Sequence, residues 1–155
     1  MNVAVDTREY VTVLKEMTEQ GLEVAMTISG VSMEPFLIHE RDRIYFRRPE
    51  GPIRKGDMVF FQRKTGEYVM HRVMKVRKGK YYLAGDHQTF LEGPIEAEQI
   101  FAKVVGVERD GVWLTEQDAL WKFYAGWWRR LYWVRKVVNK VKWVIGSRIG
   151  IRIGK

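Results

Sequence analysis

Cysteine is absent from this sequence of 155 residues. Its absence excludes disulfide bonds, thiolate metal sites and a cysteine nucleophile, so a nucleophile must be sought among other residue types. Histidine is scarce too, and none of the three copies has the spacing to a second ligand that is typical of zinc sites. The sequence therefore predicts no metal and no other cofactor.

Long apolar runs are missing at the start of the chain. Residues 1–10 show no basic region followed by an apolar stretch, so neither a secretory signal nor an N-terminal membrane span is expected. We expect the protein to be cytoplasmic, either free or peripheral at the inner face of the membrane.

Acidic residues are rare at one end of the chain. Residues 117–155 contain ten Lys/Arg and only one acid, Asp118, so the net charge of +8 arises there. The length corresponds to about one domain. The 46% hydrophobic content is that of a folded protein.

Three parts are expected along the chain. Residues 1–21 hold a short amphipathic helix over 7–20, which Gly21 ends. Residues 22–116 alternate short apolar runs with turn residues, which is typical of an antiparallel β domain. Residues 117–155 return to helical spacing, with an apolar stripe among basic residues. The fold class is therefore mainly β, with a helix at each end.

Seven strands are predicted in the β part. They are Val24–Ile28, Arg43–Phe46, Met58–Arg63, Tyr68–Val76, Tyr81–Ala84, Ile100–Val107 and Val112–Leu114. Glycine in the short connections 64–67, 77–80 and 109–111 suits tight hairpins that need positive φ. Neighbouring strands should therefore pair antiparallel.

Ser32 is the candidate nucleophile, in the segment Ser29-Gly-Val-Ser-Met-Glu-Pro35. Gly30 permits unusual backbone angles and Pro35 fixes φ, so a rigid turn is expected. Such a turn can present a hydroxyl with its own backbone N–H aimed at a substrate carbonyl. A serine in a glycine-containing loop is nevertheless more often an ordinary polar residue, so Ser32 alone is weak evidence.

Serine needs a base to remove its proton, and His71 lies in a predicted strand that could orient its ring. Burial for packing is the alternative role of this histidine. A carboxylate that supports the base could come from Asp86 or Glu92, although each also fits an ordinary loop.

Four segments resemble, in order, the sequence boxes of the signal peptidase I family and its relatives, which include the LexA-like self-cleaving repressors. The resemblance covers roughly residues 27–108. The segments are Ser29–Pro35, similar to the nucleophile box Ser-Met-x-Pro; Gly56–Phe60, similar to the Gly-Asp strand opening; Met70–Val73, similar to the base box in its histidine form; and Gly85-Asp86, similar to the third box.

The resemblance implies a coiled β structure with a shallow groove in which substrate binds as an added strand. Ser32 would attack a peptide carbonyl, His71 would take the proton, and an acyl-enzyme would form. Glu92 falls where histidine-type enzymes carry a supporting aspartate, and Asp86 stays open as the alternative. Binding of the oxyanion and of the substrate is assigned to Ser29, Gly30, Met33 and Pro35, together with the Ser32 N–H.

The function expected from the resemblance is removal of a leader or signal segment from a precursor peptide or protein. One alternative is an inactive peptidase-like module that binds peptide or membrane. Another is a LexA-like self-cleaving regulator, which would need a DNA-binding domain and an Ala-Gly linker ahead of the serine. The Ala-Gly pair of the C-terminal part, Ala125-Gly126, follows the serine rather than preceding it.

Residues 121–145 are too charged to span a bilayer and contain five tryptophans. Tryptophan, an apolar face and basic flanks suit an interfacial helix on anionic lipid. The alternative is that the helix folds back on the β body. Nucleic acid is the least favoured partner, because no recognisable binding module accompanies the basic residues.

Overall fold

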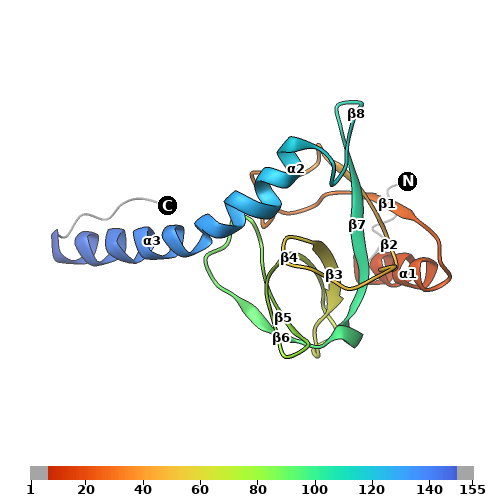
Figure 1. Ribbon diagram of the computed structural model, residues 1–155, viewed down its shortest axis with the longest axis horizontal. Helices are drawn as coiled ribbons and strands as arrows, with labels where there is room; N and C mark the ends of the chain where they lie inside the picture. Colours follow the sequence, from red (N-terminus) through yellow and green to blue (C-terminus); the bar gives the residue numbers. More distant parts are fainter. Residues whose placement is uncertain (1–6, 150–155) are drawn as a thin grey trace.

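The computed structural model describes residues 7–149, and one antiparallel sheet of eight strands forms its body (Figure 1). The strand order is β1-β2-β7-β3-β4-β5-β6, with β8 paired to β7. In chain order the elements of the body are α1 (Thr7–Glu19), β1 (Val24–Thr27), β2 (Arg43–Arg47), β3 (Met58–Gln62), β4 (Tyr68–Arg77), β5 (Lys80–Ala84), β6 (Glu92–Ile95), η1 (Ala97–Gln99), β7 (Ile100–Arg109) and β8 (Val112–Leu114). The ends of two predicted parts, residues 1–6 and 150–155, lie outside the described residues.

The mainly β fold is confirmed, and each of the seven predicted strands is present with slightly different ends. The eighth strand, β6, was missed. Its sequence Glu-Gly-Pro-Ile resembles a turn, yet it pairs with β5 through Leu83↔Glu92 and Tyr81↔Ile95. Proline is tolerated there because β6 is at the edge of the sheet, where no neighbour requires its missing N–H.

Two-residue turns close the hairpins β4–β5 and β7–β8. Lys78 and Gly79 have φ of 50° and 71°, and Asp110 and Gly111 have φ of 49° and 77°. Two successive left-handed residues match the twist of the flanking strands, and glycine adopts that conformation without strain. The predicted hairpins therefore form at these two positions.

The two faces of strands β3 and β4 carry different parts of the core. Phe60 belongs to a large cluster that includes Met33 and Phe36. Val59 and Val73 belong to a smaller cluster on the other side. Because side chains alternate along a strand, consecutive residues of β4 are delivered to opposite faces.

The C-terminal segment comprises α2 (Ala119–Phe123), a π-helical turn, η2 (Tyr124–Trp128), and α3 (Arg129–Ile149). Its first part docks on the body through the buried side chains of Trp121 and Tyr132. Beyond these turns α3 projects away from the sheet (Figure 1). Over residues 7–149, none of the helices has both the length and the apolar character that a bilayer crossing demands.

Candidate active site

Ser32 lies in the loop between β1 and β2, and its backbone is fixed by the turn that follows β5. The His87 N–H donates a hydrogen bond to the Ser32 carbonyl oxygen, 3.0 Å away. A Cβ atom at Gly85 would overlap the same carbonyl, so only glycine allows this close approach. Gly85 and the His87 N–H therefore position the serine loop.

A cavity of about 270 Å³ lies beside Ser32. Two residues of β4, Val69 and Met70, line it together with Ser32, and they directly precede His71. The serine loop and the histidine strand thus meet around one cavity. Within residues 7–149 no hydrogen bond joins the Ser32 hydroxyl to the His71 ring.

His71 is 3% exposed and packs near Phe61, with ring centroids 6.1 Å apart. Its Nδ1 is buried without a hydrogen-bond partner and lies 3.8 Å from Glu92 Oε2. Burial lowers the pKa of His71 to about 4, while Glu92 acts to raise it and Arg63 to lower it. The ring is therefore neutral at pH 7, the form that can accept a proton.

Glu92 is held in place by Arg63 of the loop after β3. The guanidinium donates from Nε to Oε1 at 2.6 Å and from Nη2 to Oε2 at 2.9 Å. Such a bidentate pair fixes the orientation of the carboxylate. Of the two acids that the sequence left open, the structure therefore brings Glu92 to His71.

Asp86 has a different partner, and its assignment as support for the base is corrected. Arg72 binds both of its carboxylate oxygens, at 2.7 Å each, and also donates to the Gly56 carbonyl at 2.8 Å. Arg72 is fully buried and its guanidinium lies 5.2 Å from the ring centroid of Phe36, in the large cluster. Since His71 and Arg72 are consecutive in β4, the ion pair and the imidazole occupy opposite faces.

The Gly30 N–H, assigned to the oxyanion, donates to His39 Nδ1 at 2.9 Å in the free protein. The Ser32 N–H has no partner among residues 7–149 and can donate to a carbonyl. Ser29 is exposed beside it at the same cavity.

The remaining two substrate assignments lie in different surroundings. Met33 is 2% exposed and belongs to the core, and it also lines the cavity beside Ser32. Pro35 does not line that cavity. It lies instead on a groove of about 600 Å³, which His87 and residues of α3 also line.

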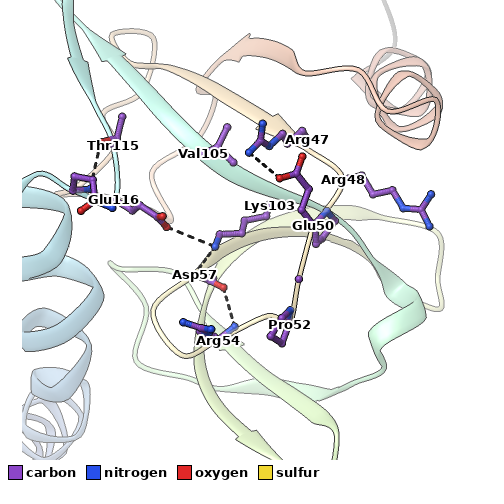
Figure 2. Close-up of a pocket in the computed structure, with 13 residues that line it drawn as sticks. Arg47, Arg48, Glu50, Pro52, Arg54, Asp57, Lys103, Val105, Thr115 and Glu116 are labelled. Atoms are coloured by element: carbon purple, nitrogen blue, oxygen red, sulfur yellow. Dashed lines mark hydrogen bonds and ion pairs between the residues drawn. The ribbon is translucent and has the colours of Figure 1, made fainter.

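A further cavity, of about 520 Å³, contains several charged side chains but none of the predicted site residues (Figure 2). Lys103 pairs there with Asp57 at 3.2 Å and with Glu116 at 3.8 Å. Asp57 also accepts the Arg54 N–H at 2.8 Å. The carboxylates of Asp57 and Glu116 thus pair with Lys103, and Asp57 of the Gly-Asp segment has a structural role.

The family model described as Peptidase S24-like matches residues 2–106, a range that includes Ser32, His71 and Glu92. Curated proteins gave no match to the chain. The family match confirms the relationship to the signal-peptidase/LexA-like serine peptidases, without selecting the signal peptidase I branch. The chain belongs to the Peptidase S24-like family.

Proposed function

We propose that this protein is a serine endopeptidase that removes a leader or signal segment from a precursor peptide or protein. Family membership indicates a serine peptidase or a LexA-like self-cleaving function. The observation that carries the proposal is the meeting of the Ser32 loop with β4 around one cavity, while Glu92 lies beside the neutral ring of His71.

In the proposed mechanism Ser32 Oγ attacks the peptide carbonyl and its proton passes to His71 Nε2. Glu92, on the Nδ1 side, stabilises the imidazolium that forms. The Ser32 N–H donates to the oxyanion. His71 then gives the proton to the leaving amine, and water, activated by the same ring, hydrolyses the acyl-enzyme.

The contact between Ser32 Oγ and the His71 ring must form when substrate enters. Catalytic hydrogen bonds are commonly loose in free enzymes and tighten in the substrate complex. Ser32 is half-buried, and the hydrogen bonds of its loop fix the backbone and not the hydroxyl, so a small rotation of the side chain is compatible with the rest of the fold.

The cavity beside Ser32 supports a preference for a small apolar side chain before the cleaved bond. Its walls include Met26, Ile28, Met33 and Phe60, and its volume is about 270 Å³. Apolar walls favour an apolar side chain over a charged one, because a buried charge would lack a partner. The limited volume of the cavity favours a small side chain.

Cleavage in trans is favoured over self-cleavage at Ala125-Gly126. This pair lies in the π-helical turn η2, where Ala125 packs against Gly56. A peptide that binds as an added strand must be extended, and a bond inside a docked helix is not.

A peptide library analysed by mass spectrometry tests the proposal. Wild-type protein should cleave a subset of peptides after small residues, and Ser32→Ala and His71→Ala should each abolish cleavage while the protein stays folded. Thr27→Ala and His87→Ala, which alter exposed side chains near the loop, serve as controls and should keep activity.

A serine-reactive probe separates the enzyme from an inactive module. Labelling that maps to Ser32 and is lost in His71→Ala requires an assembled site. Cleavage that persists in folded Ser32→Ala would contradict the proposal. Absence of both cleavage and labelling would favour the peptide-binding module.

A further inference from the structure

The distal part of α3 exposes an apolar row that no other described residue covers. We call it the valine stripe; it comprises Val134, Val137, Val138, Val141 and Ile145, which are 43% to 61% exposed. Spacings of three and four residues place them on one face of the helix. This part of α3 lies outside the body (Figure 1).

The stripe points away from the residues that dock α3. The Tyr132 hydroxyl donates to the Thr89 carbonyl at 3.1 Å, and Arg135 donates to the Asp86 carbonyl. At 100° per residue, Val141 is about 180° around the helix from Tyr132, and Val137 about 160° from Arg135. The body therefore cannot cover the centre of the stripe while α3 is docked.

Basic residues border the stripe on both sides. Six Lys/Arg and no acid occur between Arg129 and Ile145. Lys140 lies on one flank and Lys142 on the other, and Lys136 lies farther round on the face opposite the stripe; all three are exposed. Trp133, 57% exposed, lies on the same flank as Lys140, whereas Trp143, 73% exposed, lies on the side opposite the stripe.

We propose that residues 133–145 of α3 lie in the plane of an anionic membrane surface, with the valine stripe in the acyl boundary. A helix with an apolar face, basic flanks and exposed tryptophan binds such interfaces, and anionic headgroups complement its charge. A second copy is a poor occupant, because two such helices would repel. Nucleic acid is a poor occupant too, since aliphatic side chains do not stack on bases as aromatic ones do.

Membrane binding would place the candidate site near the lipid. Val134 and Val138 line the groove of about 600 Å³ that Pro35 and His87 also line. The stripe thus continues into a groove whose wall includes Pro35, which is three residues after Ser32 in the chain. This consequence rests on the proposed function, whereas membrane binding itself does not.

Vesicle flotation of the full chain carrying Ser32→Ala tests the proposal separately from catalysis. Vesicles of phosphatidylcholine alone are compared with vesicles that also contain phosphatidylglycerol. We expect preferential binding to the anionic vesicles, weakening as salt is raised. Lys140→Ser with Lys142→Ser should reduce partitioning by about fivefold for each lysine.

Apolar contact is tested by Val137→Glu with Val141→Glu, which should reduce partitioning at least tenfold, as an order-of-magnitude expectation. Glutamate is a better helix former than valine, so lost binding would not reflect a lower helix propensity. Val137→Ala with Val141→Ala is a second variant that removes apolar area without adding charge. Circular dichroism checks the helix in each.

Matched controls lie on the body. Val13 and Val112 are 54% and 59% exposed, and Lys55 and Lys64 are exposed lysines far from α3 in the chain. Paired Val→Glu or Lys→Ser changes at these positions should leave partitioning within about twofold.

Several outcomes would overturn the proposal. They are no vesicle binding, equal binding to neutral and anionic vesicles, or equal loss in the body controls. A dimer in sedimentation that the stripe variants dissociate, without vesicle binding, would assign the stripe to a second copy instead. Binding to an oligonucleotide but not to vesicles would assign the basic face to nucleic acid.

Discussion

Glu92 of β6 lies beside His71 of β4, with Glu92 Oε2 3.8 Å from His71 Nδ1. The same carboxylate is bound by Arg63 through two hydrogen bonds. Burial depresses the pKa of the histidine, and the carboxylate acts in the opposite direction. A neutral base next to a fixed negative charge is suited to hold a proton for the duration of one reaction step.

The buried histidine should make stability depend on pH. Because the folded pKa is about 4 and the ordinary value is 6.5, the unfolded chain binds more protons between these values. The contribution of neutral His71 is complete above pH 6.5 and is lost as pH falls toward 4, for a total of about 3 kcal/mol.

Urea unfolding of wild type and His71→Leu at pH 7.5 and pH 4.5 measures this contribution. We expect the free energy of unfolding of wild type to fall by about 2 kcal/mol more than that of the variant. Identical changes in the two proteins would show that His71 titrates normally.

Replacement of Glu92 by glutamine should change the pH dependence of cleavage as well as its rate. The acidic limb of kcat/KM reports the protonation of the base in the free enzyme. Glu92 raises the pKa of His71, so Glu92→Gln should move that limb to lower pH. We also expect kcat to fall on the order of 100-fold, because the imidazolium loses its counter-charge.

Glu92→Asp is the matched control for that experiment. It keeps the charge, which should preserve part of the activity and keep the limb near its wild-type position. A merely structural role for Glu92 would lower activity in both variants without moving the limb.

Asp86→Asn should destabilise the protein without touching the base. The change leaves the Arg72 charge buried and without its bidentate partner, at a cost of about 3 to 5 kcal/mol. The paired change Arg72→Met with Asp86→Leu removes both charges and should recover most of that loss. Chemical denaturation measures all three proteins, and an Asp86→Asn variant as stable as wild type would contradict this role.

Much of the fold could be predicted from sequence because the pattern that determines it is local. Alternating apolar residues marked seven strands, and Lys78-Gly79 and Asp110-Gly111 marked two hairpins. Strand β6 escaped because Gly93-Pro94 has the local character of a turn, and its strand conformation comes from pairing with β5.

The candidate site could be predicted only in part, because some of its contacts depend on long-range pairing and not on local sequence. Ser32 and His71 became candidates through short sequence boxes that resemble those of a family. The choice between Asp86 and Glu92 depends on which face of the sheet each acid meets, and that follows from long-range pairing. The docking of α3 uses the carbonyl oxygens of Asp86 and Thr89, and backbone acceptors leave no trace in a sequence.

The same docking contacts predict that α3 affects catalysis at a distance. Trp128 Nε1 donates to the Asp86 carbonyl at 3.0 Å, in the turn whose His87 N–H holds the Ser32 carbonyl. In the wild-type protein the Arg135 guanidinium lies 4.5 Å from the Trp128 ring centroid. Trp128→Phe removes the Nε1 donor but keeps an aromatic ring at this position. We therefore expect the variant to position the Ser32 loop less precisely, with little loss of protein stability.

We expect Trp128→Phe to lower kcat by about 3- to 10-fold with little change in KM, because small misplacement of a nucleophile slows the chemical step. Trp127→Phe is the matched control, since Trp127 is the adjacent tryptophan and is 65% exposed. Steady-state kinetics on one cleaved peptide compares the two. Equal losses in both variants would attribute the effect to the helix as a whole, whereas a loss confined to Trp128→Phe follows from its hydrogen bond to the turn that holds Ser32.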